Sequence, residues 1–193
     1  MSSKSLKERQ GEIIALVLLV QKGDTEAFSK LYDIFIDPVY RYVYYRVKNG
    51  DVEDIVETVF LKVWENIKKF KVEKKPFSAW IFKIAHNLVI DYYRVSSDET
   101  FRELDERMPD VTREHNPINK AEQNLDNQIL KKALAKLKKP YRDVIIHKFI
   151  NGFSNEEIGQ ILRKKEGGLR VLQFRALKAL KRELENMGIN YEI

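Results

Sequence analysis

Residues 154–182 have the sequence SNEEIGQILRKKEGGLRVLQFRALKALKR, which carries the signals of two helices joined by a short turn. Ser154 stands three residues before Glu157, the spacing of a capping box in which both side chains bind free backbone N–H groups at a helix start. A glycine pair follows the first helix, and apolar residues recur at helical spacing beyond it. A short helix, a turn with glycine and a longer helix are the elements of a helix-turn-helix motif.

The longer helix has an apolar face and a basic face. A helical wheel turns Leu169, Leu172, Ala176, Leu180 and Leu184 inward. The outward residues include five cations and no acid: Arg170, Val171, Phe174, Arg175, Lys178, Lys181 and Arg182. Such a helix suits the major groove of duplex DNA. The alternative is a basic surface helix without a ligand.

The rest of the chain also has helical periodicity, and no run of strict alternation interrupts it. Gly23-Asp24 and Asn49-Gly50-Asp51 each predict a helix end followed by a new N-cap. Asp37-Pro38 predicts a further helix start, because proline is favoured at the first helical position. The sequence therefore predicts an all-α protein.

Charge divides the 193-residue chain into three segments. Residues 1–94 carry 16 basic and 13 acidic groups (+3), residues 95–126 carry 4 and 9 (−5), and residues 127–193 carry 15 and 7 (+8). The middle segment is also the poorest in periodic apolar residues. We expect two small helical domains, 1–94 and 127–193, joined by a flexible acidic linker, 95–126. A surface loop within one domain is the alternative.

Composition excludes several classes of protein. The chain has no cysteine, so disulfides, thiolate metal sites and a cysteine nucleophile are excluded. The longest apolar run, residues 13–20, is far shorter than the roughly 20 residues of a membrane span, and Glu8 and Glu12 interrupt the basic residues that an export signal would need. The three histidines, at positions 86, 115 and 147, have no metal-binding spacing. We expect a cytoplasmic protein without catalytic site, metal or cofactor.

The helix that follows Asp51 has a second stripe of residues in addition to the apolar face that packs into a core. Val52, Val56, Val59, Phe60, Val63 and Ile67 form its apolar face. A second stripe contains Asp54, Glu57, Leu61 and Trp64, about 130° away on the wheel. Two acids beside an outward leucine and tryptophan indicate a docking site for a basic, partly apolar partner. Alternatively, Trp64 borders the core and the acids are solvated.

Residues 77–94 form a second such helix. One side is apolar, and the other aligns Trp80, Lys83, Asn87, Asp91 and Arg94. An aromatic plane, cations and an amide suit single-stranded nucleic acid, because rings stack on bases and cations meet phosphates. The preceding loop, 68–76, is basic and contains Phe70. Alternatively, Asp91 and Arg94 simply pair along the helix and the loop is only a soluble one.

With these three faces, the chain resembles bacterial sigma factors of the sigma-70 family, in their extracytoplasmic-function (ECF) group. The strings that carry the resemblance are 23–28, 51–64, 77–94, 141–144, 154–159 and 166–170. They cover both predicted domains and stand in the family's order. The chain departs from the pattern where Glu57 replaces the usual glutamine and where Leu172 and Leu177 replace frequent arginines.

The resemblance implies a role for each face. Core RNA polymerase would bind Asp51, Asp54, Glu57, Leu61 and Trp64. The melted −10 element would contact Phe70, Lys74, Lys75, Trp80, Lys83, Asn87 and Arg94, although Asp91 and Arg94 could instead brace their helix. The duplex −35 element would contact Gly168, Arg170, Val171, Phe174, Arg175 and Lys178.

The resemblance also implies the partners: the β′ and β subunits of core polymerase, promoter DNA and an anti-sigma factor, with no membrane insertion and no cofactor. It makes residues 1–94 sigma region 2 and residues 127–193 sigma region 4. The alternative function is a helix-turn-helix regulator that acts without polymerase, for which an outward Leu61 and Trp64 would have no use. A helical hydrolase has no assembled metal or nucleophile site in its favour.

Overall fold

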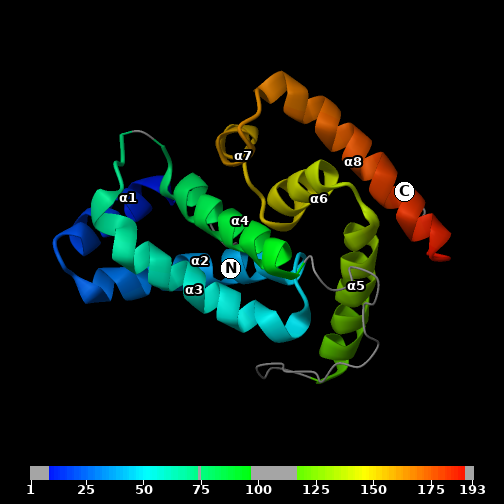
Figure 1. Ribbon diagram of the computed structural model, residues 1–193, viewed down its shortest axis with the longest axis horizontal. Coiled ribbons are helices and arrows are strands. Elements are labelled where there is room, and N and C mark those ends of the chain that lie inside the picture. Colours follow the sequence, from blue (N-terminus) through cyan, green and yellow to red (C-terminus); the bar gives the residue numbers. More distant parts are fainter. Residues whose placement is uncertain (1–8, 74, 97–116, 190–193) are drawn as a thin grey trace.

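The computed structural model describes residues 9–73, 75–96 and 117–189, and every regular element among them is helical. The order is α1 (Gln10–Gln21), α2 (Thr25–Tyr44), η1 (Asn49–Asp51), α3 (Val52–Asn66), η2 (Ile67–Lys69), α4 (Phe77–Ser96), α5 (Pro117–Lys136), α6 (Lys139–Ile145), η3 (Ile146–Ile150), α7 (Asn155–Leu162) and α8 (Glu166–Asn186). Figure 1 shows α1 to α4 as one group and α5 to α8 as another. Within the described ranges, no helix is long and apolar enough to cross a bilayer. The predicted all-α, two-domain class is confirmed.

The first group is built around α2, which packs against α1, α3 and α4. The helix begins as expected: Gly23 has a positive φ of 100°, and the Asp24 carboxylate accepts a hydrogen bond of 2.9 Å from the Ala27 N–H. Its apolar stripe buries Leu31, Phe35 and other residues at helical spacing.

The predicted helix start at Asp37-Pro38 is wrong, because α2 continues through Pro38 to Tyr44. Proline cannot donate the backbone bond that a helix interior expects. Beyond it, Val39, Tyr42 and Val43 are wholly buried, and this packing keeps the helix continuous. The Pro38 carbonyl accepts a hydrogen bond of 3.2 Å from Asn151 of the second group.

The helix-turn-helix consists of α7 and α8. The capping box is present, with the Ser154 hydroxyl accepting from the Glu157 N–H and the Glu157 carboxylate accepting from the Ser154 N–H. The turn is shorter than the sequence suggests: Arg163 ends α7 in the left-handed region (φ 54°), and α8 already begins at Glu166. The glycine pair therefore lies in the first turn of α8 rather than in the loop.

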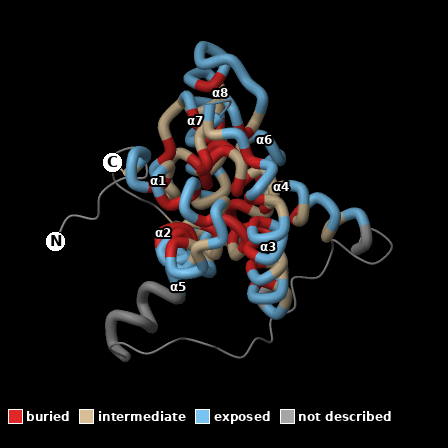
Figure 2. Tube along the Cα trace, turned by 90° about the vertical axis from the view of Figure 1, so that its left-hand side faces the viewer, coloured by how far each residue is buried: buried red, intermediate tan, exposed pale blue. Residues whose placement is uncertain are grey.

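The two groups share a continuous buried core. Helix α7 packs on α4, and η3 packs on α2. Buried segments of both groups face each other in the middle of the molecule (Figure 2). Helix α5 begins at Pro117, so residues 117–126 of the expected linker are helical, whereas residues 97–116 lie outside the described part.

Gly159 is required by the tight turn that follows α7. A Cβ at this position would lie 2.8 Å from the Lys164 carbonyl oxygen, a backbone atom that cannot move aside cheaply. We expect Gly159→Ala to lower the free energy of unfolding by about 1–3 kcal/mol, as overpacking does elsewhere.

Gly167→Ala is the matched control, since a Cβ at this helical position meets nothing within 4 Å. It should raise stability by about 0.5–1 kcal/mol, because alanine loses less backbone entropy in a helix than glycine does. Urea unfolding followed by circular dichroism measures both changes. Equal effects of the two substitutions would contradict this account of the turn.

Candidate nucleic-acid and partner interfaces

The stripe on α3 is exposed, as its spacing predicts. Asp54 and Glu57 lie at the surface, Leu61 is 57% exposed and Trp64 is 42% exposed. The opposite side of the helix buries Val56, Val59 and other apolar residues. Since Leu61 fills no part of the core, its exposed position has no packing function.

Aromatic residues of α2 support this stripe. Phe28 meets Trp64 edge to face, with ring centroids 4.9 Å apart, and Tyr32 lies beside Phe60 at 4.5 Å. Tyr32 is itself 40% exposed. The indole of Trp64 is therefore held in place while part of its surface remains open, an arrangement that suits an interface anchor.

Asp51 lies at the start of α3, apart from the stripe. Its carboxylate accepts a hydrogen bond of 2.7 Å from the hydroxyl of Tyr92 on α4. Burial and this bond raise the pKa of Tyr92 to about 12. Asp51 thus joins α3 to α4, and its side chain is partly buried.

Trp80 and Asn87 line an open hollow of about 390 Å³ between α3 and α4. Its remaining walls are Lys62, Asn66, Lys69, Ile84, Leu88 and Asp91. Small-molecule pockets span roughly 300–1,000 Å³, so the hollow has room for one planar ring. An aromatic side chain, amides and two cations surround it, which is the chemistry that an unstacked base requires.

The other cations expected on this side vary in exposure. Lys75 and Arg94 are exposed, and Arg94 pairs with Asp91 at 3.4 Å, whereas Lys74 lies outside the described residues. Burial, together with the nearby charges of Arg163 and Lys139, lowers the pKa of Lys83. Arg163 and Lys139 belong to the second group of helices, which therefore lies close to the side of α4 that is predicted to bind nucleic acid.

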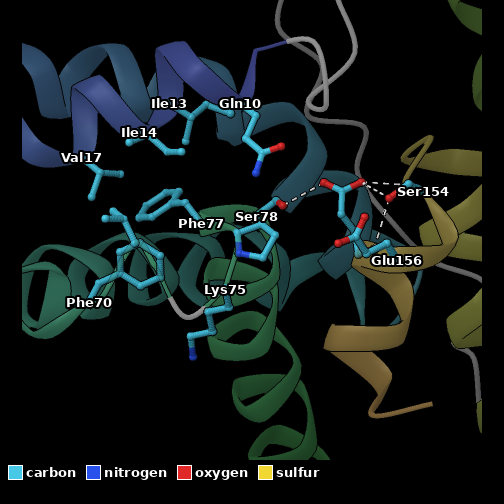
Figure 3. A pocket seen from close by; sticks show the side chains of 13 residues that line it. Gln10, Ile13, Ile14, Val17, Phe70, Lys75, Phe77, Ser78, Ser154 and Glu156 are labelled. Atoms are coloured by element: carbon cyan, nitrogen blue, oxygen red, sulfur yellow. Dashed lines mark hydrogen bonds between the residues drawn. The ribbon is translucent and has the colours of Figure 1, made fainter. Parts of the chain in front are cut away.

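Phe70 differs from its predicted neighbours because its side chain is only 6% exposed. Figure 3 shows its ring and that of Phe77 beneath the apolar side chains of α1, while Lys75 points away from them. The ring also lies 5.0 Å from that of Trp80. Phe70 therefore positions Trp80 and offers little surface of its own to a ligand.

The outward face of α8 is exposed throughout the predicted set. Val171 is 51% and Phe174 70% exposed, and Gly168, Arg170, Arg175 and Lys178 are exposed as well. Leu169 and Ala176 are buried on the opposite side, and Leu172 is partly buried against the core. Leu177 lies at the flank of the buried side and is 42% exposed.

Sequence reasoning missed two groups of residues. Lys62 and Asn66 help to line the hollow beside Trp80, together with Lys69 of the predicted basic loop, but on a wheel of α3 alone these two residues look like ordinary solvated positions. The second group lies between the two halves of the molecule and includes Arg46, Asp143 and His147, all buried. Their signal was a charged or polar residue within an otherwise apolar stretch of helix.

Comparison with known families follows the division into two groups. The family described as Sigma-70 region 2 matches residues 31–98, and the family described as Sigma-70, region 4 matches residues 127–180. The ECF RNA polymerase sigma factor SigW of Bacillus subtilis is 33% identical over 180 residues, covering 87% of this chain and 94% of that protein. The ECF RNA polymerase sigma factor BldN of Streptomyces coelicolor is 32% identical over 173 residues, covering 89% of this chain and 66% of that protein.

Solved structures support the same fold. CnrH, in complex with the cytosolic domain of CnrY, matches with a TM-score of 0.70 at 23% identity and covers 89% of this chain and 96% of that one. The sigma factor RpoE from Bartonella quintana, in complex with the anti-sigma factor NepR, matches with a TM-score of 0.63 at 21% identity and covers 82% and 96%.

The packing of Phe70 predicts a stability defect on truncation. We expect Phe70→Ala to lower the free energy of unfolding by about 3–5 kcal/mol, because it leaves a cavity among aromatic rings. Lys75→Ala, five residues away and exposed, should change it by less than about 0.5 kcal/mol. Chemical denaturation measures both, and a small effect of Phe70→Ala would mean that its ring is free to meet a ligand.

Proposed function

The chain belongs to the ECF RNA polymerase sigma factors, and from this membership we propose how its three exposed faces divide the work of transcription initiation. The observation that carries the proposal is that one fold presents an acidic and apolar stripe on α3, an aromatic and amide-lined hollow beside α4, and a basic face on α8. Each has the chemistry of a different partner.

The α3 stripe binds core RNA polymerase. Asp54 and Glu57 attract a basic surface, and the exposed Leu61 and Trp64 supply the apolar centre that stable interfaces have. Asp51 lies at the edge of this contact. A regulator that acts without polymerase has no use for such a stripe.

The hollow beside α4 holds a base of the melted −10 element. Trp80 offers a ring for stacking and Asn87 an amide for a base edge. Lys62 and Lys69 lie at its rim, where they meet the backbone phosphates together with Lys75, Lys83 and Arg94. Phe70 does not contact the base, and its buried ring supports the ring of Trp80.

Helix α8 reads the duplex −35 element in the major groove. The first turns of a recognition helix approach the base edges, and here they expose Gly168, Arg170, Val171 and Phe174. Arg175 and Lys178 follow on the same face and meet phosphates. The apolar Val171 and Phe174 suit contact with thymine methyl groups.

Simultaneous contact with both elements requires the two domains to separate. Elements centred 25 base pairs apart lie about 85 Å apart along B-DNA, at 3.4 Å per base pair. A compact chain of this length has a radius of gyration of roughly 16 Å and cannot span that distance. We infer that α5 to α8 leave the first group when the protein enters the holoenzyme.

The protein acts by binding alone, without bond chemistry, and works in the cytoplasm, where core polymerase is found. Structural relatives have been solved with the cytosolic domain of CnrY and with the anti-sigma factor NepR. An anti-sigma factor is therefore the third partner that we propose for this chain, after polymerase and promoter DNA.

Purified protein added to core RNA polymerase should start transcription at a defined set of promoters, which sequencing of the transcripts identifies. Leu61→Glu should abolish this activity and polymerase binding while changing the free energy of unfolding by less than about 0.5 kcal/mol, because Leu61 is exposed. Initiation without promoter preference would contradict the function. A collapse of the fold in Leu61→Glu would contradict the position of the stripe.

Arg170→Ala should weaken discrimination at the −35 element by about 1–3 kcal/mol if its guanidinium meets a base. Its contact with Glu166 is exposed and 3.4 Å long, so the side chain can turn to DNA at little cost. Lys181→Ala, farther along the same helix, should weaken binding slightly and equally for all sequences. Holoenzyme binding to single-base variants of the promoter tests both, and identical profiles would exclude Arg170 from base recognition.

A further inference from the structure

The contact between the two halves of the molecule is rich in titratable groups. Tyr42 of α2 stacks on His147 of η3, with ring centroids 4.9 Å apart and planes at 26°. Beside this stack, Arg46, in the turn just after α2, forms an ion pair with Asp143 of α6. The Arg46 guanidinium also lies over the Tyr42 ring at 4.1 Å. All four side chains are buried, so the shared core of the two halves contains polar groups removed from water as well as apolar residues.

We call this contact the seam, and it continues along α4. His86 lies beside it, with Nδ1 2.9 Å from the Tyr42 hydroxyl. Phe82 and Phe153 close the ring cluster at 4.6 Å, and the Ser78 hydroxyl donates a bond of 2.9 Å to Glu157 (Figure 3). The capping glutamate of the helix-turn-helix therefore also ties α7 to α4.

The seam leaves polar atoms unsatisfied. Among the described residues, neither ring nitrogen of His147 has a hydrogen-bond partner, and Nε and Nη2 of Arg46 have none either. Unpaired buried polar groups cost free energy that water would recover. Opening the contact lets water reach these unpaired groups, which offsets part of the cost of exposing apolar rings such as Phe82 and Phe153.

Two of the three histidines of the chain lie at this contact, and neither can take up a proton easily while it is closed. Burial, followed by the charges of Arg46 and His86, lowers the pKa of His147 well below its usual value. Burial is also the main cause that lowers the pKa of His86 to about 4.

The charged and titratable groups that face the two rings come from every element around them. They are Tyr42 of α2, Arg46 of the turn that follows it, Lys83 and Tyr93 of α4, and Lys139, Arg142 and Asp143 of α6. From α7, Glu157 is bound to Ser78 and Ser154. Burial and the nearby cations disfavour a positive charge on either ring, and Asp143 offsets only part of this effect at His86.

We propose that the seam is a proton-sensitive latch: it keeps the DNA-binding domains together while His86 and His147 are neutral and releases them when these histidines are protonated. The latch is a property of the free protein and goes beyond the proposed function. The proposed function enters only as its consequence: when the seam opens, the faces of α4 and α8 are free to reach separate promoter elements.

The direction follows from linkage. Once the domains separate, the histidines face water and take up protons near pH 6.5, whereas in the closed form their pKa values lie below that. The open form therefore binds more protons below pH 6.5, and closure weakens as the pH falls. Between pH 7.5 and 5.5 each histidine should favour opening about tenfold, and the two together about 100-fold.

Thiol labelling measures this opening in the whole protein, because the natural chain has no cysteine. Ser78→Cys places one thiol at the closed seam, and Ser29→Cys places one on an exposed surface. The ratio of their maleimide labelling rates at the same pH reports the opening equilibrium and cancels the pH dependence of the thiol itself. This ratio should rise about 100-fold from pH 7.5 to 5.5.

Matched variants assign the effect to the histidines. His147→Phe keeps a ring against Tyr42, and His86→Gln keeps an acceptor for the Tyr42 hydroxyl. Each should leave about a tenfold rise, and the double variant should leave almost none. Asp143→Lys, which places a second cation beside Arg46, should raise the ratio at both pH values.

Val59→Cys separates opening from unfolding, since Val59 is buried within the first domain. Its labelling should stay slow at pH 5.5. A flat ratio at position 78, an equal rise in the double histidine variant, or a parallel rise at position 59 would each overturn the latch. None of these outcomes touches the proposed function, because polymerase takes no part in the measurement.

Discussion

The stack of Tyr42 on His147 and the ion pair of Arg46 with Asp143 join the two groups of helices and so help to set how α4 and α8 stand relative to each other. The two domains share one buried core, and these polar side chains lie within it beside apolar contacts such as Phe82 with Phe153. An ion pair that leaves water gains little net free energy unless its remaining hydrogen-bonding groups are satisfied. Here two nitrogens of Arg46 are not, so the ion pair itself adds little to the strength of the contact.

Buried polar groups in the contact suit a protein that needs both a closed and an open arrangement of its two domains. Closed, the chain buries Phe82 and Phe153 against each other and keeps apolar surface from water. In the open form that we propose, the chain must separate α8 from α4 by several times the radius of gyration of the compact chain. A wholly apolar interface would hold the domains too firmly, whereas polar groups at the seam reduce the loss when water enters.

The local helix signals were strong enough to be predicted from the sequence. The box of Ser154 and Glu157, the cap at Asp24 and the outward Leu61 and Trp64 all depend on spacing within one helix, and the structure has each of them as expected. The helix start predicted at Pro38 was wrong, because the presence of a proline does not reveal whether the side chains around it pack well enough to keep the helix continuous. A helical wheel could not predict residues that act through contacts between different elements. Phe70 is one of them, since it lies buried beneath α1.

The sequence by itself determined the helices, their caps, the division of charge and the chemistry of each outward face, because these follow from side chains three or four positions apart on one helix. Tertiary structure decided which faces remain outward. Helix α4 is covered on a second side by α7, so Ser78 and Phe82 are buried, and the hollow beside Trp80 exists only because α3 lies alongside. The physical reason is that burial depends on contacts between residues far apart in the chain, such as Arg46 and Asp143, and no local pattern encodes those contacts.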